Sequence, residues 1–102
     1  MIRVVDFREK VQGGEYVGRP SVLGNRFLIG HRHTRRECIE RYRTWLRAEW
    51  KNGGAVKAEL LRLARKYRAR GDLTLVCWCA PSACHADVVK EAIERVVEKG
   101  LV

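Results

Sequence analysis

The sequence has few acidic residues and no long apolar run. It contains 12 Asp and Glu against 21 Lys and Arg, with two prolines and one methionine in 102 residues. No apolar run approaches the roughly 20 residues that cross a bilayer, so we expect no membrane partner. Hydrophobic residues make up 46% of the chain without a low-complexity tract, which is typical of one folded domain spanning residues 1–102.

The first ten residues, MIRVVDFREK, lack the uninterrupted apolar segment of a secretory signal peptide. We therefore expect a cytoplasmic protein, in which thiols stay reduced. In that compartment a group of cysteines indicates a metal site, a catalytic site or a buried strand rather than a disulfide framework. Three of the four cysteines form such a group, Cys77, Cys79 and Cys84.

The formal net charge is +9 at pH 7, and arginine outnumbers lysine. Guanidinium groups bind phosphate through paired hydrogen bonds, so this charge predicts a small phosphorylated ligand or a nucleic acid as partner. A basic surface that contacts only water and salt would give the same net charge. The sign of the charge therefore leaves both interpretations open.

Hydrophobic periodicity along the chain alternates between the patterns of strands and helices. Thr34 and Glu37 match a capping box at the start of one helix, and Asn52-Gly53-Gly54 ends it. The glycine-rich segment before that helix contains five glycines and one proline, which predicts mostly loop with short extended pieces. The expected elements are a strand at 2–7, a loop at 13–33, a helix from Thr34 to the Asn52 stop, a helix at 55–69, a strand at 73–79 and a helix at 84–99.

This order predicts the α/β class: a small single domain with a short, mostly parallel sheet flanked by helices. The sequence of elements is strand, loop, helix, helix, strand, helix, and strands joined through helices run parallel. The near-continuous apolar segment LTLVCWC at 73–79 predicts a strand covered on both faces.

The segment VCWCAPSACHAD contains the densest group of reactive side chains. In a regular strand Cys77 and Cys79 point to the same face with Cα atoms about 6.6 Å apart. A disulfide between them would break the strand, and zinc needs their sulfurs within about 4 Å of each other. A metal is therefore not favoured; if one is present, its ligands are Cys79, Cys84 and His85. Cys77 and Trp78 are interpreted as packing residues.

The residues of this segment favour a ligand-binding site over a metal site. Cys84 and His85 follow the turn after the strand and begin the last helix, where α/β proteins bind ligands. A helix N-terminus stabilises an anion or a thiolate. We predict Cys84 as a nucleophile and His85 or Asp87 as a general acid or base. Alternatively, Asp87 only caps the helix.

The segment GRPSVLGNRF supplies a second group of candidate residues. Its glycines permit backbone conformations closed to other residues, its arginines can clamp phosphate, and its serine and asparagine can hydrogen-bond a ligand. Alternatively, it forms a rigid Ω-like loop packed by Pro20, Leu23 and Phe27. The predicted ligand-binding residues are Gly18, Arg19, Ser21, Gly24, Asn25, Arg26 and Cys79.

These two segments resemble the motifs of an uncharacterised family of domains found in phages and bacteria. Its members pair GRPSPLGNPF near the N-terminus with CWCAPxxCHGD near the C-terminus, and TRRECIERYRTWL between them resembles the family's helix. The resemblance extends over about residues 2–92. Arg26 stands where the family has proline, and Ala86 where it has glycine. The resemblance implies no reaction, and a phage origin would place the protein in the host cell cytoplasm.

Three functions remain open at this stage. In the first, the 18–26 loop and the Cys79/Cys84/His85 turn face each other and bind a phosphorylated or nucleotide-like ligand, with or without turnover. The second is a basic accessory protein that binds nucleic acid, and the third a zinc-stabilised interaction module. The oligomeric state is not predicted. The nucleic-acid surface would comprise Arg35, Arg36, Arg43, Arg62, Arg65 and Lys66.

Overall fold

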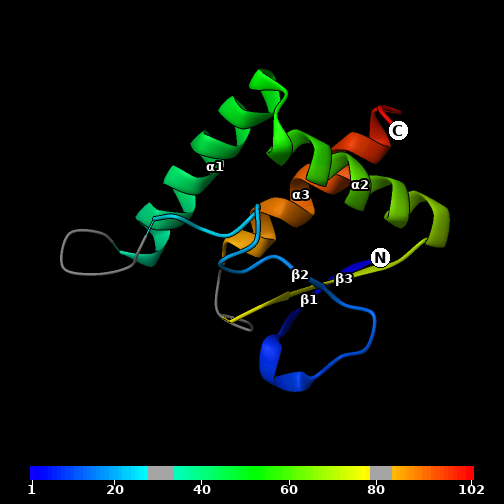
Figure 1. The fold of residues 1–102 in the computed structure, drawn as a ribbon, viewed down its shortest axis with the longest axis horizontal. Coiled ribbons are helices and arrows are strands. Elements are labelled where there is room, and N and C mark those ends of the chain that lie inside the picture. Colours follow the sequence, from blue (N-terminus) through cyan, green and yellow to red (C-terminus); the bar gives the residue numbers. More distant parts are fainter. Residues whose placement is uncertain (28–33, 79–83) are drawn as a thin grey trace.

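The computed structural model describes residues 1–27, 34–78 and 84–102. It has the predicted α/β fold, with every expected strand and helix in place within about two residues of its expected ends (Figure 1). A short 3-10 helix and a two-residue strand are added in the segment before the first helix. The elements are β1 (Ile2–Asp6), η1 (Phe7–Glu9), β2 (Glu15–Tyr16), α1 (Arg35–Asn52), α2 (Ala55–Arg70), β3 (Leu73–Cys77) and α3 (His85–Glu98).

The sheet has three strands in the order β1-β3-β2, and both pairings are parallel. Ile2 of β1 lies opposite Leu73 of β3, and Tyr16 of β2 lies opposite Val76 on the other side of β3. The prediction of a parallel sheet is therefore confirmed. Because all three strands point the same way, their carboxyl ends meet at one edge of the sheet.

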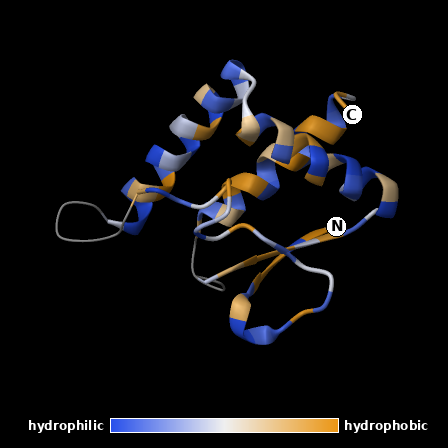
Figure 2. Ribbon diagram, viewed as in Figure 1, coloured by the Kyte–Doolittle hydropathy of each residue, from blue (hydrophilic) through white to orange (hydrophobic). Residues whose placement is uncertain are grey.

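The core lies between the sheet and the helices, which occupy one side of it in Figure 1. Leu73, Leu75 and Cys77 point into this core and are at most 4% exposed, as expected for Cys77. Strands β1 and β3 are mostly apolar, whereas α1 and α2 alternate between apolar and polar residues (Figure 2). Within the described ranges, no helix is long and apolar enough to cross a membrane.

The prediction that β3 is covered on both faces needs a correction. Thr74 and Val76, on the face away from the core, are only half-buried. The backbone at Gly14 lies against this face, so close that a Cβ there would come within 2.6 Å of Val76 Cγ2. A glycine-containing loop, not a helix layer, covers this part of the strand.

Helix α1 begins and ends as its sequence predicts. The Glu37 N–H donates to Thr34 Oγ1 at 3.1 Å, which completes the predicted capping box. Gly53 ends the helix with φ of 75°, a left-handed conformation that favours glycine. The buried face of α1 consists of Cys38, Tyr42 and Leu46.

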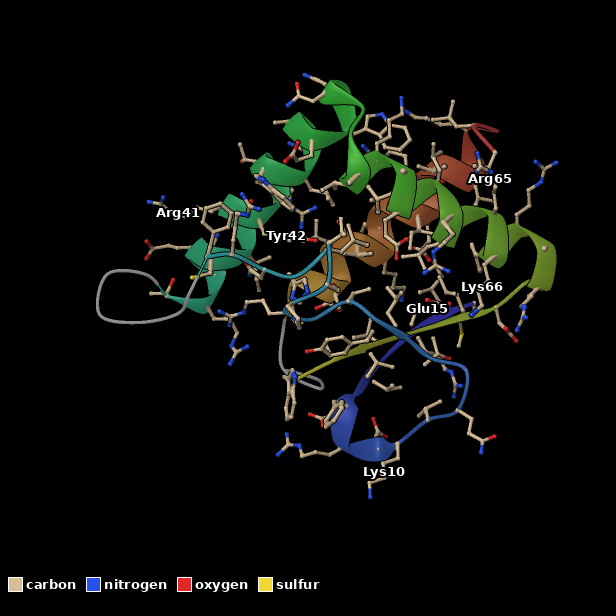
Figure 3. The ribbon with its side chains drawn as sticks, viewed as in Figure 1. Lys10, Glu15, Arg41, Tyr42, Arg65 and Lys66 are labelled. Atoms are coloured by element: carbon tan, nitrogen blue, oxygen red, sulfur yellow. The ribbon has the colours of Figure 1, made fainter. Side chains whose placement is uncertain are left out.

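An ion-pair cluster holds the short strand β2 against α2. The Glu15 carboxylate accepts hydrogen bonds from Arg62 Nη2 at 2.7 Å and from Lys66 Nζ at 2.6 Å (Figure 3). Hydrogen bonds to Glu59 and then Glu15 raise the pKa of Arg62, and the bond from Arg62 is the main cause that lowers the pKa of Glu15. Two cations predicted for a nucleic-acid surface are thus bound to carboxylates of the protein itself.

Replacing a side chain in the middle of β3 should destabilise the fold strongly. Leu75 is 0% exposed, so Leu75→Ala leaves a cavity and should lower the free energy of unfolding by about 2–5 kcal/mol. Val11→Ala, at a position 37% exposed, should change it by no more than about 0.5 kcal/mol. Urea unfolding followed by circular dichroism measures both, and equal effects would contradict the burial described.

Candidate functional site

The candidate site lies at the edge of the sheet formed by the carboxyl ends of the three strands (Figure 1). β1 ends at Asp6, β2 at Tyr16 and β3 at Cys77, and the N-terminus of α3 follows at His85. The loop of residues 17–27 leaves β2 at this same edge. Parallel α/β sheets bind ligands outside the carboxyl ends of their strands.

Each strand brings one aromatic residue to this edge. Phe7 directly follows β1, Tyr16 ends β2 and Trp78 directly follows β3. Phe7 and Trp78 stack with ring centroids 4.3 Å apart, and Tyr16 lies edge-on to Phe7 at 6.3 Å. We call these three residues the aromatic shelf. Phe7 and Trp78 are 47% and 53% exposed, so Trp78, interpreted as a packing residue, packs against Phe7 at the surface of the molecule.

Capping interactions hold Phe7 of the shelf in place. The Arg8 N–H donates to Asp6 Oδ1 at 2.7 Å, and the Asp6 N–H donates to Glu9 Oε2 at 2.9 Å. The Arg8 side chain also binds both Asp6 oxygens, which lowers the pKa of Asp6 to about 2. This capping box fixes the direction in which the chain leaves β1, and with it the position of the Phe7 ring.

A hydrogen bond links His85 of the second motif to Val17, the residue directly before the GRPSVLGNRF motif. His85 Nε2 lies 2.7 Å from the Val17 carbonyl oxygen, 68 residues away along the chain. A carbonyl oxygen only accepts, so Nε2 carries the proton and donates. Burial is the main cause that lowers the pKa of His85, and Arg19 lowers it further. His85 is therefore neutral at pH 7, with Nδ1 unprotonated.

Cys84 occupies the N-cap of α3 and lies beside the free lone pair of this histidine. Its Sγ is 3.4 Å from His85 Nδ1, and the Ala86 N–H donates to the same sulfur at 3.4 Å. The Asp87 carboxylate accepts a hydrogen bond from the Cys84 N–H at 3.1 Å. Cys84 and His85 are 2% and 7% exposed. This is a thiol and imidazole pair at a helix start, enclosed by protein.

The loop is also fixed to α1 and to the aromatic shelf. The Tyr42 hydroxyl of α1 donates to the Leu23 carbonyl oxygen at 2.6 Å, and burial raises the pKa of Tyr42. The Tyr16 hydroxyl donates to the Arg19 carbonyl oxygen at 2.6 Å and accepts from Trp78 Nε1 at 2.8 Å. Of the three residues that the packed-loop alternative expects to be packed, Leu23 is 1% exposed, Phe27 is half-buried and Pro20 is exposed. The loop is therefore a fixed structure with one packed side.

The two glycines of the loop serve close packing rather than unusual backbone angles. Neither Gly18 nor Gly24 has a positive φ, so that prediction was wrong. A Cβ on Gly18 would come within 2.5 Å of the Tyr16 hydroxyl oxygen, and one on Gly24 within 2.9 Å of Arg19 Cα. A larger residue at either position would displace the loop from the shelf.

The polar residues of the loop differ in what they contact. Arg19 is exposed and close enough to His85 to affect its pKa. The Arg26 guanidinium instead lies over the Trp45 ring, 4.6 Å from its centroid, and Asn25 Oδ1 accepts from the Phe27 N–H at 2.8 Å. Ser21 Oγ is buried and has no hydrogen-bond partner in the described part of the chain. Of the two arginines in the loop, Arg19 is the one whose charge lowers the pKa of His85.

The remaining predicted residues fall into three groups. Cys79 lies outside the described residues, so the predicted metal set of Cys79, Cys84 and His85 stays a prediction; among the described residues no three His, Cys, Asp or Glu side chains form a metal cluster. Of the cations predicted for nucleic acid, Arg43 binds Glu91 at 2.6 Å. Arg35, Arg36 and Arg65 lie exposed on α1 and α2.

The sequence matches the family of domains of unknown function DUF4326 over residues 4–95. The chain belongs to this family. No curated protein matches the sequence, and no solved structure does either. The match covers most of β1 and α3 and all of β2 and β3, so the candidate site lies wholly within the family's domain.

The site predicts a pH dependence of stability that depends on His85. Because the pKa of His85 is lowered in the folded state, the unfolded chain binds more protons as the pH falls below about 6.5. The free energy of unfolding should therefore fall between about pH 7 and pH 5. His85→Gln keeps an N–H donor for Val17 but does not titrate, so it should show a smaller fall in urea unfolding.

His85→Ala is the matched control for the hydrogen bond itself. It removes the donor and leaves a cavity, so it should lower the free energy of unfolding at pH 7 by about 2–4 kcal/mol.

A pH dependence that is equal in the wild type and in His85→Gln would contradict the assignment of a buried, neutral His85.

Proposed function

We propose that this domain binds a phosphorylated, nucleotide-like ligand at the carboxyl edge of the sheet. The base lies on the aromatic shelf and the phosphate binds Arg19. The observation that carries this proposal is the His85–Val17 hydrogen bond at 2.7 Å. It fixes the loop that bears Arg19 beside the shelf and the N-terminus of α3.

The aromatic shelf supports the nucleobase part of the proposal. Exposed aromatic pairs are costly to leave in water, yet Phe7 and Trp78 are both about half exposed. Capping bonds and the Tyr16–Trp78 hydrogen bond hold them in fixed positions. The exposed face of an aromatic ring held in this way can bind a base by stacking, worth about 1–3 kcal/mol per base.

Arg19 supports the phosphate part better than the helix N-terminus does. The Ala86 N–H donates to Cys84 Sγ, and the Asp87 N–H donates to the Cys84 carbonyl oxygen. These helix donors are already used, so an anion there would have to displace the cap. Arg19 is exposed, and its carbonyl oxygen is hydrogen-bonded to the shelf residue Tyr16. Its guanidinium can bind phosphate with two hydrogen bonds.

In this proposal Cys84 and His85 position the loop. Their burial leaves little surface for contact with a ligand, and both hydrogen-bond within the protein. Binding without turnover is therefore the form of the proposal that the geometry favours. The catalytic roles of Cys84, His85 and Asp87 stay predictions, as does the zinc-stabilised module.

The proposal can be tested by titrating the protein with the four common nucleoside 5′-monophosphates and monitoring its amide chemical shifts by NMR. We expect shifts at Phe7, Tyr16, Arg19 and Trp78 with at least one nucleotide. Trp78→Ala and Arg19→Ala should each weaken this binding by about tenfold or more, corresponding to about 1.4 kcal/mol. Arg65→Ala, an exposed arginine on α2, should leave it unchanged.

Two further ligands separate the parts of the site. The free nucleoside should depend on Trp78 and inorganic phosphate on Arg19. If no nucleotide binds the wild type, or if Arg65→Ala weakens binding as much as Arg19→Ala, the proposal is wrong. Binding only to single-stranded oligonucleotides, with affinity that falls steeply as salt rises, would favour the nucleic-acid function instead.

A further inference from the structure

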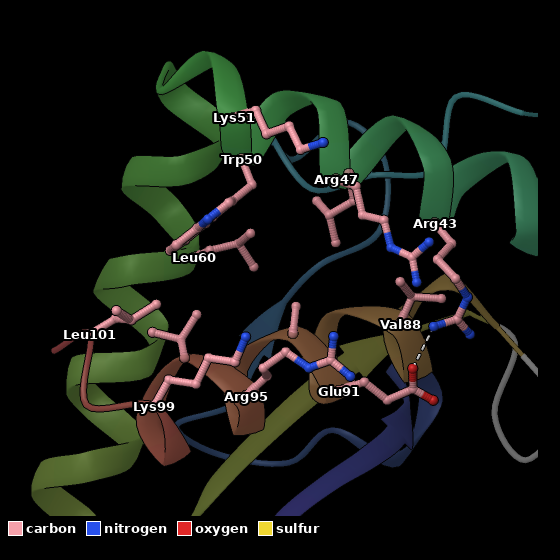
Figure 4. Close-up of a pocket in the computed structure, with 13 residues that line it drawn as sticks. Arg43, Arg47, Trp50, Lys51, Leu60, Val88, Glu91, Arg95, Lys99 and Leu101 are labelled. Carbon is pink, nitrogen blue, oxygen red and sulfur yellow. Dashed lines mark hydrogen bonds and ion pairs between the residues drawn. The ribbon is translucent and has the colours of Figure 1, made fainter.

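A second surface of the molecule has the features of a binding site and lies away from the aromatic shelf. It is a groove of about 340 Å³ between α1, α2 and α3, which begins at Val88, one turn into α3, and extends to Leu101 (Figure 4). This volume is at the low end of the range for ligand sites. The groove lies beyond the residues of the proposed nucleotide site, so its function is a separate question.

The floor of the groove is apolar and belongs to the core. Leu46 of α1, Leu60 of α2, and Val88 and Val96 of α3 line it, and each is at most 5% exposed. A ligand can therefore contact well-packed aliphatic side chains that do not need to rearrange. Leu101, which is 53% exposed, extends this apolar surface at one end.

The two sides of the groove are strongly basic. Its lining includes five cations and one carboxylate, Glu91, and this carboxylate binds Arg43 at 2.6 Å. Figure 4 shows side chains from α1 and α3 directed into the space between the two helices. Within the described ranges, the other four cations have no carboxylate within ion-pair distance. They are Arg47 and Lys51 on α1, Arg95 on α3, and Lys99 directly after α3.

These unpaired cations create a site that attracts an anionic partner. Cations that face one another over an apolar floor repel each other and focus a positive potential into the groove. Carboxylates placed between them would relieve this repulsion. Burial of the apolar floor and pairing of the cations with carboxylates should therefore both stabilise the complex.

The spacing of the cations indicates a helical partner. Arg47 and Lys51 are four residues apart on α1. Arg95 and Lys99 have the same spacing at the end of α3, where Lys99 is the C-cap, so each pair is separated by about 6 Å along the helix axis. The acidic residues of a partner helix recur at the same interval on either side of an apolar stripe. Such a helix would place its apolar face on the floor and its carboxylates along both basic rows.

The lining fits a nucleic acid less well. Apart from the Trp50 indole, none of the side chains that line the groove is a neutral hydrogen-bonding group able to read a base edge. The Trp50 ring has Lys57 Nζ 4.9 Å from its centroid, so a cation already occupies one face on which a base would stack. We propose that the groove between α1 and α3 binds an acidic amphipathic helix of a partner protein.

A designed peptide provides the direct test. The probe has about 14 residues, or about 21 Å of helix, with leucines along one stripe and glutamates on both sides. A second peptide has the same composition in scrambled order, and a third has lysine in place of every glutamate. Isothermal titration calorimetry should show binding of the first peptide to the wild type, with the scrambled peptide about tenfold weaker and the lysine peptide not bound.

Two double variants with the same change in net charge locate the binding. The double variant Arg47→Glu with Arg95→Glu should weaken binding of the acidic peptide by about tenfold or more and allow the lysine peptide to bind. Arg41→Glu with Arg65→Glu, at exposed positions of α1 and α2 outside the groove (Figure 3), should change its affinity by less than about threefold. Amide shifts in the wild type should map to residues 43–51 and 88–101, which tests the location even if a variant does not fold.

Three results would overturn the proposal. The first is that the acidic peptide does not bind the wild type. The second is that both double variants reduce the affinity for this peptide equally. The third is that a single-stranded oligonucleotide of equal charge displaces the peptide and produces the same amide shifts more strongly. That result would make the groove a nucleic-acid site. None of these results tests Arg19 or Trp78, so either proposal can be rejected without the other.

Discussion

The hydrogen bond from His85 to the Val17 carbonyl oxygen holds the candidate site together. The loop after β2 has little regular structure, and its position must come from contacts distant in sequence. His85 at the start of α3 provides one such contact at 2.7 Å, and Tyr42 on α1 provides another through Leu23. Both contacts are buried, so losing either donor would leave a backbone carbonyl without a partner, at a cost of about 1–3 kcal/mol.

This bond also determines the tautomer of His85, which lies beside the Cys84 thiol. With Nε2 donating to Val17, the neutral imidazole presents Nδ1 to Cys84 Sγ at 3.4 Å. The Cys84 thiol, the Ala86 N–H and the Asp87 carboxylate then close the first turn of α3. In this geometry His85 of the cysteine and histidine pair connects the loop to α3.

The sequence predicted the elements well because their signals are local. Thr34 and Glu37 cap α1 through contacts within three residues, and the helical spacing of Val56, Leu60 and Leu63 places them together on the buried face of α2. The convergence of the two motifs was also predictable, since parallel strands share a carboxyl edge.

The aromatic shelf could not be predicted in the same way. It needs β2, a strand of two residues with no periodicity, to bring Tyr16 next to Phe7 and Trp78. The roles of Gly18 and Gly24 likewise depend on what lies opposite them, namely Tyr16 and Arg19. The sequence does place an aromatic residue at the carboxyl end of each strand. This pattern indicates a shared aromatic surface only when the three strands are known to be parallel.

The most direct measurement is the tautomer of His85, obtained from long-range ¹⁵N–¹H NMR spectra of the imidazole ring at pH 7. The structure predicts a neutral ring with its proton on Nε2 and slow exchange of that proton with water, because the N–H is buried against Val17. A proton on Nδ1, a charged imidazolium or a freely exchanging ring would contradict the link between the loop and α3, and with it the proposed ligand site.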